Sequence, residues 1–406
     1  MVNQLKHRLD LVFETDDSRR GYFSYLAMYF VAFWGEPIYF TYLLVYFRQI
    51  GYSTVTIGYL YSIGPGIALL AQPFWGWLSD RSRVKNHVLY IILAGTGITM
   101  LLMGFTQSLP IVFTIFISHA FFRSSQHPVE DSLALDFLSR HRLRYGPVRA
   151  VGTLGYMFVV LLLGWAVKWE IRIIFPLYLV FSIMSILAVR RTPPVQGAMK
   201  ARQKFEFKKI KNGKLLLGYV LFSFLVSFPY GFYSTFFPLY LTSDLGGSAS
   251  VLGVLMFSMA ALEVIFMLGG EKLVNRFGLN SLLVYAGIVS LVRWVLTYLV
   301  MDPTTQIFVQ MLHGISYMVV HFCLINYIHQ CVPPEVRTTG QTLYALVYSG
   351  LARILPSLIG GYLSALYGIR FLFLVAIIML VVSLVLLAFL IQYSKRKGTE
   401  DALHCI

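Results

Sequence analysis

The sequence predicts an all-α membrane protein with twelve transmembrane helices in two pseudo-symmetric six-helix halves and with both termini in the cytoplasm. Three observations predict this fold: an apolar composition, a succession of long apolar segments, and a one-sided distribution of Lys and Arg. Of the 406 residues, 57% are hydrophobic and 13% are charged. Soluble domains carry about 25% charged residues. We therefore expect a chain with a mean hydropathy of +0.70 to be solvated by lipid.

Twelve segments are long and apolar enough to span a bilayer, which takes about 20 residues in a helix. They lie near residues 22–47, 54–79, 87–107, 111–138, 148–168, 172–190, 215–242, 250–274, 281–300, 305–331, 338–366 and 369–393. The connections are short except for one polar and basic stretch. The predicted parts are an N-terminal cytoplasmic segment (1–20), a first bundle (21–190), a basic linker (191–214), a second bundle (215–394) and a cytoplasmic tail (395–406).

The basic residues orient this bundle. With the N-terminus inside, 25 of the 33 Lys and Arg residues fall in cytoplasmic segments, four fall outside and four within spans. Lys and Arg concentrate in cytoplasmic loops, so both termini are predicted to be cytoplasmic. The net charge of +15 is spread over these loops and does not predict a nucleic-acid partner. The N-terminal segment lacks the pattern of a cleavable signal peptide, and we expect the first apolar segment to remain as a span.

A weak internal repeat supports two halves. At a constant offset of 195, Ser53–Gly58 faces Ser248–Gly253, and Asp80-Arg81 faces Asn275-Arg276. Such matches at equivalent places predict parallel six-helix repeats.

The loop after the second span carries a recognisable motif. Gly76 is followed by Asp80, Arg81 and Arg83, a pattern that resembles the loop signature of the major facilitator superfamily, with Arg83 where that signature has a second Gly. A decayed copy in the second half contains Asn275 and Arg276. The resemblance implies a secondary transporter in which this loop and its copy act in the conformational switch.

A narrower resemblance, to the lactose permease and phenylpropionate permease branches, covers nearly the whole chain. It rests on Gln72–Gly76, Asp131–Leu135, Tyr145–Arg149, Glu263–Met267, Asn275–Gly278, Arg293-Trp294, Leu312–Gly314 and His321.

Ionisable residues inside the predicted spans are candidates for function, because each costs about 2.5–3.5 kcal/mol on insertion scales. They are Glu36, Arg123, His127, Glu130, Asp131, Arg149, Glu263, Arg293, His313, His321 and Arg353. We expect them to face one another or a water-filled cavity.

The first half is predicted to bind the solute. Arg123, His127 and Asp131 recur every four residues, which places them on one face of a helix. The family resemblance implies that Asp131 and Arg149 bind substrate, and that an aromatic ring at Tyr156 stacks on it.

Two further acids belong to this predicted site. Glu130 fits the acidic position with a one-residue slip, and Glu36 precedes Pro37 where the helix backbone is loosened. The alternative for Asp131 and Arg149 is a structural ion pair between two helices. The alternative for Glu130 is a solvated position near the helix end, and that for Glu36 is a structural role.

The second half is predicted to handle the proton, through Glu263, Arg293, His313 and His321. An arginine that approaches or leaves a buried carboxylate changes its proton affinity. In the lactose permease branch, the positions of Arg293 and His313 belong to the proton and substrate network. The coupling acid of that branch is replaced by Ser316 here, so we expect Glu263 to carry the proton. The alternative for each histidine is a satisfied buried side chain.

These observations predict proton-coupled symport of a small polar or amphipathic solute by a monomer in the cell membrane, through alternating access. A sugar, a nucleoside and an aromatic carboxylate all remain open, and the sequence does not distinguish H⁺ from Na⁺. The alternative is a proton-driven exporter of drugs or metabolites. We expect no enzyme activity, cofactor or metal, because no catalytic, P-loop or metal-ligand motif is present and the three cysteines follow no ligand spacing.

Overall fold

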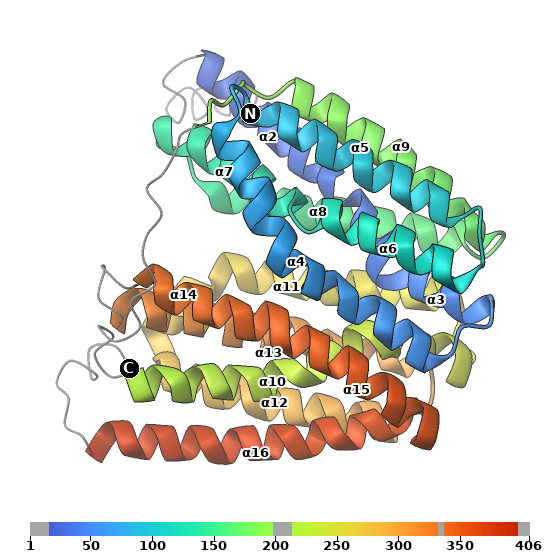
Figure 1. Cartoon of the computed structure of the whole chain (residues 1–406). Helices are drawn as coiled ribbons and strands as arrows, with labels where there is room; N and C mark the ends of the chain where they lie inside the picture. The colour runs from blue at the N-terminus through green and yellow to red at the C-terminus, as the bar shows by residue number, and fades with distance from the viewer. Residues whose placement is uncertain (1–15, 198–212, 332–336, 397–406) are drawn as a thin grey trace, which may run out of the picture. The chain divides into compact units, whose positions relative to one another are not determined.

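The computed structural model describes residues 16–197, 213–331 and 337–396, without the side chains of 213–214, 266–275, 318, 329–331, 337–339 and 394–396 (Figure 1). All regular elements in these ranges are helical. In chain order they are α2 (Asp16–Ala32), the 3₁₀ turn η1 (Phe33–Gly35), the π-helical turn η2 (Ile38–Tyr42), α3 (Leu43–Gln49), α4 (Thr54–Arg81), α5 (Lys85–Met103), α6 (Leu109–Arg123), α7 (Gln126–Arg140), α8 (Tyr145–Ala166), η3 (Ile171–Ile173), α9 (Ile174–Arg190), α10 (Gly213–Leu239), the π turn η5 (Tyr240–Asp244), α11 (Ala249–Phe277), α12 (Leu279–Leu299), α13 (Thr305–Cys331), α14 (Arg337–Ala345), the π turn η7 (Leu346–Leu351), α15 (Ala352–Tyr367) and α16 (Ile369–Arg396).

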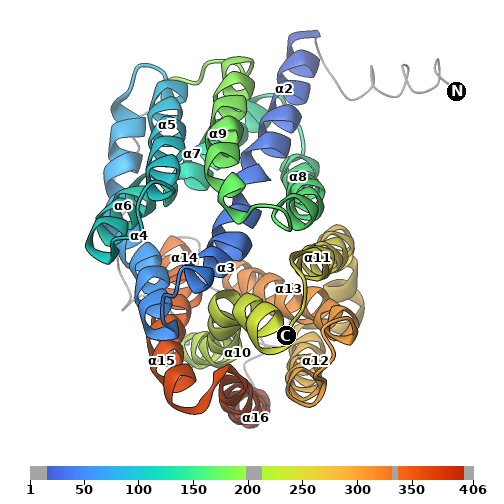
Figure 2. The same cartoon turned by 90° about the vertical axis from the view of Figure 1, so that its right-hand side faces the viewer.

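The chain forms two compact units. Unit 1 contains Met1–Leu43 and Gly66–Ala201, and unit 2 contains Leu44–Pro65 and Arg202–Ile406. In unit 1, α2 packs against α8 and α9, while α5 packs against α6 and α9 (Figures 1 and 2). In unit 2, α10 packs against α15 and α16, and α13 packs against α11 and α12. The segment from α3 to the start of α4 belongs to unit 2, although it precedes most of unit 1 in the sequence.

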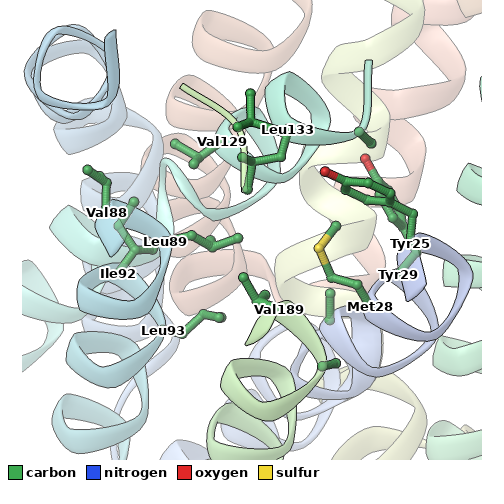
Figure 3. Close-up of a cluster of buried hydrophobic side chains, with 14 of the residues drawn as sticks. Tyr25, Met28, Tyr29, Val88, Leu89, Ile92, Leu93, Val129, Leu133 and Val189 are labelled. Carbon is green, nitrogen blue, oxygen red and sulfur yellow. The ribbon is translucent and has the colours of Figure 1, made fainter. Parts of the chain in front are cut away.

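A hydrophobic core holds unit 1 together (Figure 3). Tyr25, Met28 and Tyr29 of α2 recur at helical spacing and are fully buried. Leu89 and Ile92 of α5 are also fully buried, and residues three and four apart share one face of a helix. Each of these helices therefore presents one packed stripe to its neighbours.

The outer faces of the helices are apolar as well. Trp165 and Trp169 are 67% and 76% exposed, and Val385 of α16 is 66% exposed. Exposed apolar surface on this scale indicates contact with lipid. Ten helices in the described ranges are long and apolar enough to cross a membrane, and Ala249–Ile265 is a shorter apolar helix.

The predicted continuous span 111–138 is interrupted in the structure. Helix α6 ends at Arg123 and α7 begins at Gln126, with Ser124 and Ser125 between them. Pro128 lies in the first turn of α7, where its missing N–H breaks no helical bond.

A second irregularity surrounds Pro37. The helix tightens to a 3₁₀ turn at Phe33–Gly35 and then widens to a π turn at Ile38–Tyr42. Proline removes one backbone donor from a helix, and π turns often occur at functional sites. Both irregularities lie next to ionisable side chains.

The start of α13 shows how one exposed helix end is fixed. The carboxylate of Asp302 accepts hydrogen bonds from the backbone N–H of Thr305 at 2.6 Å and from its hydroxyl at 2.7 Å. These bonds favour the ionised acid and lower the pKa of Asp302. Asp302 thereby accepts from a backbone N–H group of the first helical turn, where such groups have no partner within the helix.

Candidate functional site

Four ionisable side chains of unit 1 form one buried cluster. Nη2 of Arg123 lies 2.6 Å from Oε2 of Glu36, and Nε2 of His127 lies 3.1 Å from Oε1 of the same acid. Nδ1 of His127 lies 2.8 Å from Oε2 of Glu130. The carboxyl groups of Glu36 and Glu130 are thus joined through one imidazole, with a guanidinium beside the first. We call this set the Glu36–His127–Glu130 chain.

The backbone irregularities position this cluster. Glu36 follows the 3₁₀ turn before Pro37, Arg123 ends α6, and His127 lies in the first turn of α7. Because α6 and α7 are separate helices, Arg123 and His127 both reach Glu36. These two residues thus point to the same place, as their spacing predicts, although they belong to two helices and not to one continuous helix.

The cluster is well supported by its surroundings. The amide of Gln126 donates to Oε1 of Glu130 at 3.1 Å and to the carbonyl of Ala32 at 3.3 Å. The guanidinium of Arg123 lies 4.0 Å from the ring centre of Tyr39, a cation–π distance. Side-chain exposures of 12% for Glu36 and 1% for Glu130 show that protein atoms, rather than water, solvate these acids.

Asp131 lies in a different set of contacts. Its Oδ1 accepts hydrogen bonds from the hydroxyls of Tyr29 at 2.5 Å and of Tyr145 at 2.6 Å. The guanidinium of Arg149 lies 4.4 Å from the ring centre of Phe33. Among the described residues, Asp131 and Arg149 do not form an ion pair. Tyr156 is partly buried against the core of unit 1.

Several residues of unit 1 escaped the sequence-based prediction. Tyr29, Tyr145 and Gln126 gave no signal, because polar groups on aromatic and amide side chains are common in packed helices. His119 did give one: it is an ionisable residue within a predicted span. Its ring is fully buried, with Nδ1 3.1 Å from the hydroxyl of Thr99.

Unit 2 contains a column of stacked aromatic rings. Tyr230 of α10 stacks on His313 at 4.8 Å and on Tyr317 at 4.2 Å, with interplanar angles of 8° and 27°. Tyr317 continues to Tyr348 of the π turn η7 at 5.4 Å. Three further rings extend the column. They are Tyr233, Tyr344 and His321, the last accepting or donating at 2.9 Å with the Tyr344 hydroxyl.

Two arginines, Arg293 buried and Arg353 partly buried, contact this aromatic column. The guanidinium of Arg293 lies 5.3 Å from the ring centre of Tyr233, and that of Arg353 lies 4.6 Å from the ring centre of Tyr230. Arg293 is only 3% exposed, yet within the described part of the chain its Nε and Nη1 have no hydrogen-bond partner. The predicted residues Arg293, His313 and His321 thus lie in or beside one aromatic column. Glu263 is partly buried on α11, and its backbone is close to Gly314 of α13.

The loop with the family signature is hydrogen-bonded to the start of the linker. The backbone N–H of Lys85 donates to the carbonyl of Val195 at 2.9 Å, and Nζ of Lys85 pairs with Asp136 at 2.7 Å. Arg81 lies over the ring of Trp77 at 4.6 Å.

Gly76, the glycine of this motif, does not lie at a close contact between helices. A Cβ at Gly76 meets nothing within 4 Å, so this position does not make the close helix approach that a glycine permits. Asp80 is partly buried, whereas Arg83 is exposed. In the second-half copy Arg276 lies 5.4 Å from the ring centre of Phe277, and the side chain of Asn275 lies outside the described residues.

No group of three or more His, Cys, Asp and Glu side chains that could hold a metal ion occurs within the described ranges. The side chains described above can take part in proton transfer, ion pairing and ring stacking.

Comparison with known proteins agrees with the fold. The model of the MFS_1 like family matches residues 22–375. The maltose permease of Geobacillus stearothermophilus is 27% identical over 379 residues, covering 92% of this chain and 95% of the permease. The probable 3-phenylpropionic acid transporter of Escherichia coli (strain K12) is 27% identical over 372 residues, covering 86% and 90%. The crystal structure of the nucleoside transporter NupG, 17% identical, shares the fold with a TM-score of 0.78 over 93% of this chain and 99% of NupG. The chain therefore belongs to the MFS_1-like family of major facilitator transporters and is a multi-pass protein of the cell membrane.

Proposed function

We propose that this transporter is a proton-coupled symporter of a small polar or amphipathic solute, working by alternating access as a monomer. In this proposal twelve spans form two six-helix halves, residues 21–190 and 215–394, and both termini are cytoplasmic. The broken pair α6–α7 and helix α11 would supply the two spans beyond the ten that are long and apolar enough by themselves.

The Glu36–His127–Glu130 chain is the observation that carries this proposal. Both ring nitrogens of His127 face carboxylate oxygens, at 3.1 and 2.8 Å. A neutral imidazole has one N–H and one lone pair, and a lone pair cannot bond an ionised carboxylate. The chain therefore needs one proton more than a neutral histidine between two ionised acids provides. That proton resides on the imidazole or on one of the acids.

Arg123 supplies a means of moving this proton. Its guanidinium favours the ionised form of Glu36 while it lies 2.6 Å away. In an apolar surrounding a carboxyl group favours its neutral form once a cation moves away. A conformational change that separates these two side chains would thus load Glu36, and one that joins them would release the proton.

Transport into liposomes tests this proposal. Purified protein is reconstituted with a pH-sensitive dye inside, and maltose, uridine or 3-phenylpropionate is added outside without Na⁺. We expect at least one solute to acidify the lumen as it enters. Transport that leaves the lumenal pH unchanged contradicts proton coupling, and transport that requires Na⁺ identifies Na⁺ as the coupling ion.

Variants in the same assay decide which acid carries the proton. Glu36→Gln is expected to leave solute entry but abolish acidification, whereas Glu170→Gln, at an exposed loop acid, should change neither. The sequence-based alternative assigns the proton to Glu263, with Arg293, His313 and His321. Loss of coupling in Glu263→Gln but not in Glu36→Gln would place the proton in unit 2.

The predicted solute site of unit 1 is tested separately. Arg149→Ala should weaken solute binding if Asp131, Arg149 and Tyr156 contact the solute. Unchanged binding in this variant removes these residues from the site.

A further inference from the structure

Arg293 is a buried cation whose hydrogen-bonding groups are not satisfied. It is 3% exposed, and neither Nε nor Nη1 has a hydrogen-bond partner among the residues that the structure describes. Burying a charge without a partner is costly. The rings of Tyr233 and Trp294, at 5.3 and 4.9 Å, offset only part of that cost through cation–π contacts. A cation–π contact, however, provides no hydrogen-bond acceptor for the N–H groups, which point outward in the plane of the guanidinium.

A second cation increases the positive charge of the same region. Arg353 lies over the ring of Tyr230, which stacks on His313. His313 is within electrostatic range of both Arg293 and Arg353. The four ion pairs Lys85–Asp136, Arg123–Glu36, His127–Glu36 and His127–Glu130 lie in unit 1 and do not involve Arg293. Glu263 lies within electrostatic range of Tyr230, but not of Arg293. Two cations and one acid thus surround the aromatic column, and an anion is favoured at its Arg293 end.

The column itself has the chemistry of a platform for a planar ring. Tyr230, Tyr233 and His313 are stacked within 6.0 Å of one another, with interplanar angles between 8° and 21°. Offset stacking of one more aromatic ring on such a set is favourable beyond the area that it buries. Arg293 lies at the Tyr233 end of the column, so a carboxylate there and a ring on the column belong to one small molecule.

We propose that the solute is an aromatic carboxylate whose carboxylate group pairs with Arg293 and whose ring packs on Tyr233 and Tyr230. This inference rests on the proposed function, because it names the solute class of that transporter. It moves the solute from unit 1, where the sequence placed it, to unit 2. Arg353 strengthens binding through its charge without the same unmet donors.

Binding measurements on the full-length protein in detergent test this assignment without any proton gradient. The probes are 3-phenylpropionate, benzoate and indole-3-acetate, each compared with its neutral amide, and binding is followed by calorimetry. We expect at least one acid to bind and its amide to bind at least tenfold more weakly. Equal binding of acid and amide, or no binding of any of the three acids, overturns the proposal.

Variants place the carboxylate. Arg293→Gln should weaken binding of the acid at least tenfold and remove the preference over the amide. Arg370→Gln is the matched control, because Arg370 also lies over a tyrosine ring, at 4.3 Å, but its Nε already donates to the carbonyl of Tyr298. Unchanged acid binding in Arg293→Gln, or an equal loss in Arg370→Gln, contradicts the assignment. If Arg293→Gln does not fold, the acid–amide comparison in the unaltered protein still decides.

The outcome is separable from that of the proton assay. Acid binding with the expected dependence on Arg293, but transport without proton movement, rejects proton coupling and keeps the anion site. Proton-coupled entry of maltose or uridine, with no acid bound, keeps the symporter and rejects the aromatic carboxylate.

Discussion

The hydroxyl of Tyr29 donates a hydrogen bond of 2.5 Å to Oδ1 of Asp131. Tyr145 donates to the same oxygen at 2.6 Å, so two hydroxyls, and not an ion pair with Arg149, stabilise this acid among the described residues. Hydrogen bonds to a charged group are stronger than neutral ones. This arrangement ties α2 and α8 to α7 and leaves Arg149 over Phe33.

Removing either hydroxyl should destabilise unit 1. We expect Tyr29→Phe and Tyr145→Phe each to lower the free energy of unfolding by about 1.5–3 kcal/mol, the range for a hydrogen bond to a charged group. The double variant should lose more than the sum, because it leaves the carboxylate with neither donor. Thermal unfolding in detergent measures this.

Tyr90→Phe is the control for these two variants. Tyr90 of α5 contacts His87 by its ring, and its hydroxyl makes no hydrogen bond among the described residues, so the change should stay within about 0.5 kcal/mol. If Tyr29→Phe is as stable as Tyr90→Phe, the hydroxyl does not stabilise Asp131.

The sequence was sufficient to find these ionisable residues but not their partners. A helical face drawn from Arg123 to Asp131 assumes one continuous helix, and the break at Ser124–Ser125 invalidates the spacing beyond it. Tyr29 is 102 residues from Asp131, so only the packing of α2 against its neighbours brings them together. The apolar segments, by contrast, could be predicted because lipid imposes length and composition on each helix separately.

Unit 2 shows the same limit in another form. Arg293, His313 and His321 were predicted as a group, because charges within apolar segments are conspicuous. The rings that join them come from α10, α13 and η7, and each is an ordinary aromatic residue of a membrane helix. A stack depends on the relative rotation of three helices, which no single segment encodes.

The pair of Glu36 and Arg123 should behave as a coupled unit. Arg123→Met leaves a carboxylate that is 12% exposed, and breaking a buried ion pair costs about 3–5 kcal/mol. We expect Glu36→Gln/Arg123→Met to recover part of that loss, because no uncompensated charge remains. A double-mutant cycle from thermal unfolding gives the interaction energy.

Arg172→Met provides the baseline for an exposed arginine and should change stability by about 0.5 kcal/mol or less. Strictly additive effects of Glu36→Gln and Arg123→Met would show that the 2.6 Å contact does not couple the two side chains.

Lys85 and Asp136 should respond asymmetrically to mutation. Their Nζ–Oδ2 distance is 2.7 Å, but the side chain of Lys85 is 4% exposed and that of Asp136 is 30% exposed. Asp136→Ala leaves a buried ammonium with only the hydroxyl of Ser132, at 3.0 Å, and should cost about 3–5 kcal/mol. Lys85→Met leaves an acid that water can reach and should cost about 1 kcal/mol. Thermal unfolding in detergent measures both effects, and Lys168→Met, at an exposed lysine, is the control. A larger loss of stability in Lys85→Met than in Asp136→Ala would contradict the argument from burial.

Glycines of α8 should show how closely this helix packs on α2. A Cβ at Gly155 would overlap the carbonyl group of Phe30, whereas one at Gly146 meets nothing within 4 Å. Backbone cannot move aside as a side chain can, so Gly155→Ala should cost about 1–3 kcal/mol through overpacking. Gly146→Ala should be neutral or stabilising by up to about 1 kcal/mol, because alanine is the better helix former. Equal stability of the two variants, measured by thermal unfolding, would mean that α2 and α8 can separate at little cost.

Gly152, on the same helix, should separate stability from function. A Cβ there would meet the ring of Phe33, and a side chain can rotate away, so Gly152→Ala should cost less stability than Gly155→Ala. The centre of this ring, however, lies 4.4 Å from the guanidinium of Arg149 and 4.5 Å from the centre of the His127 ring, on which it stacks. Moving it therefore disturbs the Glu36–His127–Glu130 chain, and we expect proton-coupled uptake in liposomes to fall several-fold. Normal coupling in a stable Gly152→Ala protein would show that the position of the Phe33 ring does not govern His127.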